Sequence, residues 1–115
     1  MTSILNSVKK LLGLTSEDHS FDVDILIHIN TVFSILTQLG VGPEEGYSIT
    51  GDTEEWSDYL EDNKLLEMVK SYMFLKVRLM FDPPQNSALI ESINKYIAEL
   101  EWRINVSVDP KKEET

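Results

Sequence analysis

The sequence predicts an all-α protein, a single small bundle of about four helices with a long acidic loop between the second and third and a flexible C-terminal tail. Three observations support this prediction. Apolar residues recur every three or four positions in four separate segments, which is the spacing of one helix face. Glycine or proline follows three of these segments, where a helix has to stop. The 115 residues suffice for one domain with its own core, and without cysteine no disulfide or thiolate metal site holds it together.

The first predicted helix covers residues 4–12. Ser3 can cap its free backbone N–H groups. Gly13 followed by the apolar Leu14 is typical of a Schellman stop, in which a left-handed glycine ends the helix. The expected core face consists of Ile4, Leu5, Val8, Leu11 and Leu12.

The second predicted helix covers residues 23–39. Ser20 or Asp22 can cap it, and Gly40 ends it. Its expected core stripe consists of Ile25, Ile29, Val32, Phe33, Leu36 and Leu39.

The connection that follows, residues 41–62, is long, acidic and contains glycine. Residues 47–50 could form a short strand, and residues 56–60 could form a helical turn that fixes the loop by its aromatic side chains. Connections of this length inside a small domain are usually functional or mobile.

The third predicted helix covers residues 64–81, with Asp62 or Asn63 as its cap. Apolar side chains cover most of its circumference, so we expect it to be the central helix of the bundle. It ends at Asp82 because Pro83 disfavours the helical conformation at the residue before it.

The fourth predicted helix covers residues 87–104. Residues 106–108 then alternate like a short strand, and residues 109–115 are polar. We therefore predict a helical domain over residues 1–105 and a flexible tail over residues 106–115. In that tail, Val106 and Val108 could add as a strand to an exposed sheet edge on a partner.

The charge is unevenly distributed. The formal net charge is −10, and no lysine or arginine lies between Lys10 and Lys64, a stretch that holds twelve acids. Tight phosphate binding needs clustered basic side chains, so sequence-specific DNA binding is disfavoured. The acids form either an ordinary solubilising surface or a surface that repels a polyanion.

Catalytic and metal-binding patterns are missing. His19 and His28 have no matching nucleophile, and neither a nucleophile elbow nor a phosphate-cradling glycine motif is present. Four loop acids could surround a hard cation, but their spacing is not that of an EF-hand, which favours a solvated loop. These acids are Asp52, Glu54, Glu55 and Asp58. We predict no enzymatic activity, no cofactor and no metal.

The outer face of the second helix is the first of three unusual features. Residues 25–39 carry no formal charge, in a chain that is 26% charged. The face opposite the core stripe includes Ile27 and Thr31, with Ile35 on its flank. Either the 41–62 loop covers this face, or it is a subunit interface, where charged residues are depleted.

Two further residues favour contacts beyond one subunit. Arg78 lies on the side of the third helix opposite the apolar stripe, and Trp102 lies off the stripe of the fourth. Tryptophan is enriched at binding hot spots, although it could instead pack on the chain's own loop or tail. Lys76 lies within the apolar stripe, where it could snorkel to the surface or pair with Glu101.

Four runs of residues resemble the head–tail connector family of tailed bacteriophages and prophages, also called head-completion or neck adaptor proteins. The most specific is LKVRLMFDPP, residues 75–84. The others are LGVGPEEG (39–46), WSDYL (56–60) and ELEWR (99–103). Together they spread the resemblance over nearly the whole chain.

The resemblance implies a helical subunit without catalytic residues that forms a ring, usually twelvefold in the virion, beneath the portal. The ring would extend the DNA channel and enable tail attachment. The implied partners are copies of itself, the portal and the next neck or tail-completion protein, with DNA only passing through and no membrane. The implied location is the virion neck, and the host bacterial cytoplasm during assembly.

Within this frame we assign two sets of candidate residues. The interface set is Ile27, Thr31, Ile35, Arg78, Trp102, Val106 and Val108; the channel-facing acidic set is Glu44, Glu45, Asp52, Glu54, Glu55 and Asp58. The alternative is a small acidic protein-binding adaptor or a DNA-mimicking inhibitor.

Overall fold

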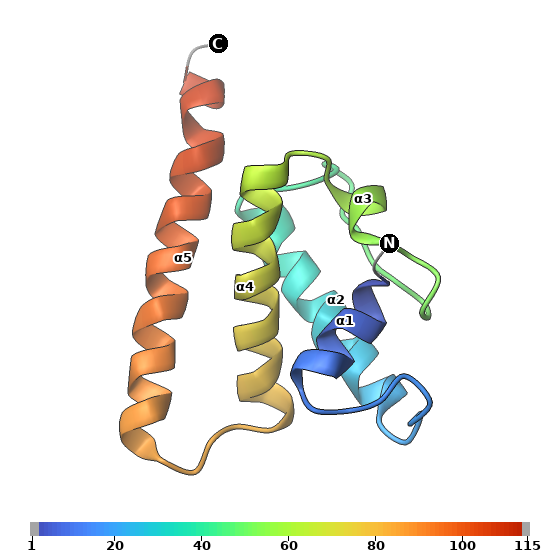
Figure 1. Ribbon diagram of the computed structural model, residues 1–115. Helices are drawn as coiled ribbons and strands as arrows, with labels where there is room; N and C mark the ends of the chain where they lie inside the picture. Colours follow the sequence, from blue (N-terminus) through green and yellow to red (C-terminus); the bar gives the residue numbers. More distant parts are fainter. Residues whose placement is uncertain (1–2, 114–115) are drawn as a thin grey trace.

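The computed structural model describes residues 3–113, and these form a layered helical bundle. Helix α4 lies between α5 on one side and α2 on the other, and α1 packs against both α2 and α4 (Figure 1). The predicted all-α class and the central position of the third long helix are confirmed. The elements are α1 (Ile4–Leu11), α2 (Asp22–Gln38), α3 (Trp56–Tyr59), α4 (Asn63–Phe81) and α5 (Ser87–Glu113).

Helix α1 begins and ends as its sequence predicts. The Ser3 hydroxyl accepts a hydrogen bond from the backbone N–H of Asn6 at 3.2 Å. At the other end Gly13 has a φ of 88°. The Leu14 N–H donates to the carbonyl of Lys9 at 2.8 Å, which is the long bond of a Schellman motif.

Helix α2 begins differently from the prediction. Phe21 is its N-cap residue and gives no side-chain hydrogen bond, so the cap predicted at Ser20 or Asp22 is wrong. Asp22 is instead the first helical residue, and its carboxylate lies 2.8 Å from the ammonium of Lys9. The carboxylate is held by an ion pair across the α1–α2 turn and is therefore not used as a cap.

Helix α4 supplies the centre of the core. Asp62 caps it by accepting from the Leu65 N–H at 3.1 Å, and it ends at Phe81, before the Asp82–Pro83 step, as predicted. Lys76 does not pair with Glu101 but lies 5.9 Å above the Tyr72 ring, whose hydroxyl donates to Glu101 at 2.6 Å. The fully buried α4 side chains are Val69, Tyr72, Met73 and Val77.

Helix α5 is longer than predicted. It continues from Ser87 to Glu113, so the strand expected at residues 106–108 is wrong. The helical pattern carries on because Val108 packs back against the core and the Ser107 hydroxyl donates to the Arg103 carbonyl at 2.9 Å. A domain boundary at residue 105 and a tail that orders on assembly stay predictions, and residues 114–115 lie outside the described part.

The 41–62 connection is held at several points. The predicted helical turn is present as α3, and the Trp56 indole N–H donates to the Ser7 hydroxyl at 3.0 Å. The strand predicted at residues 47–50 does not form, because Ile49 is paired with a side chain of α2 rather than with another strand. Gly42, with a φ of +81°, passes so close to Tyr59 that a Cβ there would lie 2.6 Å from Cε1.

Candidate functional site

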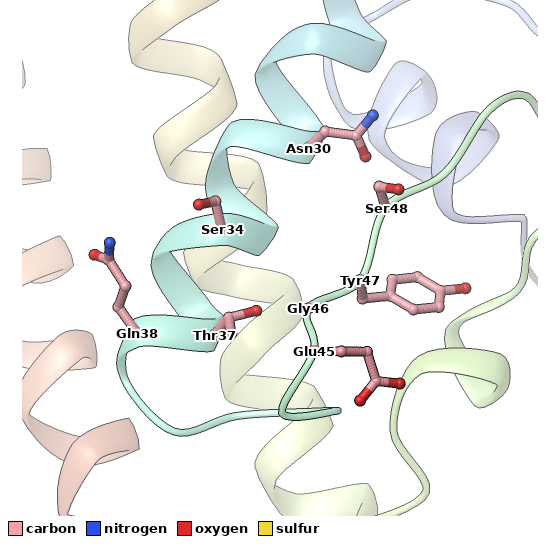
Figure 2. Close-up of a pocket in the computed structure, with 8 residues that line it drawn as sticks. All are labelled: Asn30, Ser34, Thr37, Gln38, Glu45, Gly46, Tyr47 and Ser48. Carbon is pink, nitrogen blue, oxygen red and sulfur yellow. The ribbon is translucent and has the colours of Figure 1, made fainter.

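The outer face of α2 is only partly covered by the chain itself. The Asn30 amide clamps the loop: its nitrogen donates to the Ile49 carbonyl at 3.0 Å, and its oxygen accepts from the Ile49 N–H at 2.8 Å. Figure 2 shows residues 45–48 running alongside this face. Between loop and helix lies a groove of about 480 Å³ lined by Asn30, Ser34, Thr37, Gln38, Glu45, Gly46, Tyr47 and Ser48.

The rest of that face is open. Ile27 is 57% exposed, and Val23, which precedes it by one turn, is 71% exposed. Thr31 and Ser34 continue the exposed strip toward the middle of the helix. We call Val23, Ile27, Thr31 and Ser34 the α2 strip. It is uncharged and unlike an ordinary solvated helix face, which usually carries charge.

An aromatic cluster also fixes the loop to α2. The ring of Phe33 lies 4.6 Å from that of Tyr59 and 5.1 Å from that of Tyr47, between ring centroids. Burial raises the pKa of the Tyr59 hydroxyl above its usual range. With the Asn30 clamp, these contacts make the loop an ordered part of the domain.

The six candidate acids of the loop divide into two groups. Glu44, Glu45 and Asp52 are exposed at its bends. The other three are used inside the loop. The Glu55 and Asp58 side chains form a reciprocal capping box at the start of α3, and Glu54 accepts from the N–H of Thr50 at 2.9 Å.

Glu54 is held in its charged form. Burial alone would raise the pKa of this carboxyl, but hydrogen bonds, first from the backbone of Thr50, lower it below the usual value. Its backbone carbonyl also accepts from the Ile4 N–H at 2.9 Å. Glu54 therefore fastens the loop to α1, and its half-buried carboxylate is hydrogen-bonded within the loop.

The interface candidates on α4 and α5 are in different environments. Trp102 is 67% exposed and Val106 is 41% exposed, one turn apart on α5. Val108 is half-buried, and Arg78 donates from Nε to the Asp82 carbonyl at 2.8 Å. Ile35 also packs against the core. The structure therefore presents Ile27, Thr31, Trp102 and Val106 to a partner more openly than the other three.

Sequence reasoning missed a second surface, at the end of the bundle where α2 begins and α4 ends. It is a groove of about 620 Å³ lined by Leu12, Leu14, Phe21, Asp24, His28, Met80, Phe81 and Asp82. Phe21 and Phe81 form an edge-to-face pair with centroids 5.3 Å apart. We call this the end groove. The one feature of the sequence that could have indicated this groove is Phe21, an aromatic residue in a polar linker.

The described residues hold no group of three or more histidine or acidic side chains placed to bind a metal ion. Within the same residues, no helix is both long enough and apolar enough to cross a membrane. The candidate sites described above are the α2 strip, the end groove, the exposed loop acids and the outer side of α5.

The fold and these surfaces are those of a small all-α protein whose candidate sites lie on its exterior. The comparison with protein families gives a match to the phage connector protein family over residues 4–111. The chain belongs to this family, which confirms the resemblance seen in its sequence. Comparisons with curated proteins and with solved structures gave no significant match.

Membership assigns a structural role at the head–tail junction of a bacteriophage and places the protein in the virion. It also implies association with other phage head or tail proteins, and it favours a non-enzymatic role.

Proposed function

We propose that this protein forms a ring beneath the portal, usually twelvefold in the virion, which extends the DNA channel and provides the attachment point for the tail. One observation carries the proposal. The subunit has exposed, uncharged or apolar surface on α2 on one side of α4, and an exposed tryptophan on α5 on the other. A subunit with two different contact surfaces on opposite sides binds the next copy through a heterologous interface. Such interfaces close into a ring when the rotation between neighbouring subunits divides a full turn evenly.

The acidic side chains suit the wall of a DNA channel. Glu44, Glu45 and Asp52 are exposed, and the loop that carries them is anchored by Asn30 and by the aromatic cluster. Fixed negative charge repels phosphate, so DNA can pass without being gripped. We assign these three acids to the channel lining.

The same loop argues against a DNA mimic. A mimic needs acids displayed at phosphate-like spacing on a rigid surface. Here Glu54 is bonded to Thr50, and Glu55 and Asp58 cap a helix.

The proposed partners are copies of this chain, the portal and the next neck or tail-completion protein. They would meet first in the host bacterial cytoplasm and then in the virion neck.

Electron microscopy of the purified protein mixed with its portal tests the proposal. The expected result is a ring of density coaxial with the portal, with a central opening wide enough for duplex DNA. A companion gel-shift assay should give no salt-dependent complex with duplex DNA at physiological salt. Absence of any ring on the portal, or tight DNA binding by the protein alone, would overturn the proposal.

A further inference from the structure

The end groove has the chemistry of a socket for a large apolar side chain. Its walls come from Leu12, Leu14, Phe21, Met80 and Phe81, and Asp24 and Asp82 are its carboxylates. Phe21 is 42% exposed and Met80 is 39% exposed, so aromatic and thioether surface faces solvent. Exposed apolar surface rimmed by polar groups marks a contact site.

The outer side of α5 has the complementary chemistry. Trp102 is 67% exposed, and Val106 extends the same face by one turn. Lys95 precedes Trp102 by seven residues and lies about 20° from it around the helix. It is exposed, and among the described side chains it has no carboxylate partner. Two acids share this side: Glu99 at its edge is paired with Arg103, and Glu91 lies one turn beyond Lys95, further from Trp102. Close to Trp102, the side of α5 therefore combines an apolar projection with one unpaired positive charge among the described side chains, Lys95.

Trp102 cannot reach the end groove of its own subunit. The hydrogen bond between Tyr72 and Glu101 sets the level of Trp102 at the middle of α4. Phe81 lies nine residues further along α4, about 14 Å at 1.5 Å per residue. The two sites also lie on different sides, because α4 separates α5 from α2 (Figure 1). Any tryptophan that fills the groove has to come from another chain.

We infer that Trp102 of one subunit inserts into the end groove of the next copy, with Lys95 facing the carboxylates of Asp24 or Asp82. The occupant is a second copy because this chain presents both halves, an aromatic projection with a positive flank and an apolar groove with negative charge. Opposite charges across an interface favour the correct partner and orientation. The two surfaces are distinct, so the contact is heterologous and can repeat around a ring.

This inference rests on the proposed function and specifies the central contact of the ring interface. Val23 and Ile27 of the α2 strip directly precede Asp24 and His28 of the groove, so the strip continues the same surface. A pair of single variants tests it. Trp102→Glu removes the projection and keeps the groove, whereas Met80→Glu places a third carboxylate in the groove and keeps the projection. Both side chains are exposed, so we expect both variants to fold, which circular dichroism and thermal melting check.

Sedimentation velocity then measures the oligomeric state of each variant and of their mixture. Each variant alone should be monomeric, and an equimolar mixture should form 1:1 dimers and nothing larger, because one functional contact remains per pair. In a second mixture, the Met80→Glu chain also carries Trp102→Ala, and its partner is unchanged. The dimer should then be weaker roughly thirtyfold or more, as expected for truncation of a hot-spot side chain. A matched Met80→Glu/Tyr96→Ala chain loses another exposed α5 aromatic, 49% exposed and on a different side of the helix, and should change affinity less than about threefold.

A mixture that stays monomeric, or either variant assembling alone as the wild type does, overturns the inference. So does a Met80→Glu protein that still forms rings but no longer docks on the portal, because the groove would then serve the portal. The two proposals fail separately: if both variants still form rings on portals, only this contact is wrong. If the wild type forms no ring there, the proposed function fails.

Discussion

The ammonium of Lys9 and the carboxylate of Asp22 lie 2.8 Å apart, and the Lys9 side chain is 1% exposed. The pair joins the last turn of α1 to the first turn of α2, and Lys9 also lies 3.4 Å from the Ser16 carbonyl oxygen in the intervening turn. Burying an ammonium is costly unless a counter-charge pairs with it, so this contact fixes the position of α1 on the bundle.

Replacing Asp22 by asparagine should leave a buried unpaired charge and lower the free energy of unfolding by about 3 kcal/mol. We place the cost at the low end of the range because Asp22 is 22% exposed, which lets water reach the pair. Urea unfolding measures it. Lys9→Met/Asp22→Asn should recover most of the loss, and Lys10→Met, at an exposed position, should change stability by less than about 0.5 kcal/mol. A double variant as unstable as Asp22→Asn would contradict the explanation.

The same pair predicts a pH dependence. The hydrogen bond from Lys9, and next that from His19, lowers the pKa of Asp22 below its ordinary value of 3.8. A lowered folded-state pKa contributes stability above the unfolded value, and this is lost as pH falls through the folded value. Below about pH 4, wild-type stability should therefore fall more steeply than that of Asp22→Asn. Parallel stability curves for the two proteins between pH 5 and about pH 2 would refute this.

Substitution of Asn30 should release the loop. Asn30→Ala removes both bonds to Ile49, whose backbone is buried, at a cost of about 2 kcal/mol. Hydrogen exchange at the Ile49 amide should accelerate strongly. Thr31→Ala is the matched control, because the Thr31 hydroxyl bonds only to the Ile27 carbonyl of its own helix. Unchanged exchange at Ile49 would mean that the aromatic cluster alone holds the loop.

Two isoleucines on α2 should respond differently to glutamate. Ile27→Glu, at a 57% exposed position, should leave the melting temperature within a few degrees of wild type and reduce ring formation. Ile35→Glu should unfold or strongly destabilise the subunit, because Ile35 packs against the core. Thermal melting and electron microscopy separate the two effects. Full ring formation by a folded Ile27→Glu subunit would remove the α2 strip from the interface.

Two truncations should separate the parts of the C-terminal segment. Deleting residues 106–115 removes Val108 from the core surface and should cost about 1 kcal/mol. Deleting residues 109–115 should leave stability unchanged and report on docking alone. If the shorter deletion folds, forms rings and loses affinity for the portal, the end of the chain clamps the partner. Unchanged portal affinity in both truncations would make the segment inert in assembly.

The fold was largely predictable because local signals agree with one another. Ser3, Asp62 and the Gly13–Leu14 stop act within a few residues of their own helix, so their effect can be read from adjacent positions. The even apolar coverage of residues 64–81 likewise identified the central helix. The extension of α5 was missed because Val106–Ser107–Val108 alternates over too few residues to separate a strand from a helix.

The site was less predictable because its parts come together only in three dimensions. Nothing near Lys9 in the sequence indicates that a lysine there is buried, since its partner follows thirteen positions later on another helix. The end groove combines residues from the α1–α2 turn and the end of α4, and no single segment carries its pattern. The uncharged face of α2 was predictable from the sequence. Which part of it the 41–62 loop covers depends on the hydrogen bonds between Asn30 and Ile49, which are far apart in the sequence.

The two tryptophans give the protein separate optical reporters. Trp56 is 5% exposed and hydrogen-bonded to Ser7, whereas Trp102 is 67% exposed on the outside of α5. Buried indoles emit at shorter wavelengths than hydrated ones, so the blue part of the fluorescence spectrum follows folding of the domain. In the folded protein the red part comes from the hydrated Trp102 indole and shifts when Trp102 is covered. Folding and assembly can therefore be timed independently in one unlabelled sample.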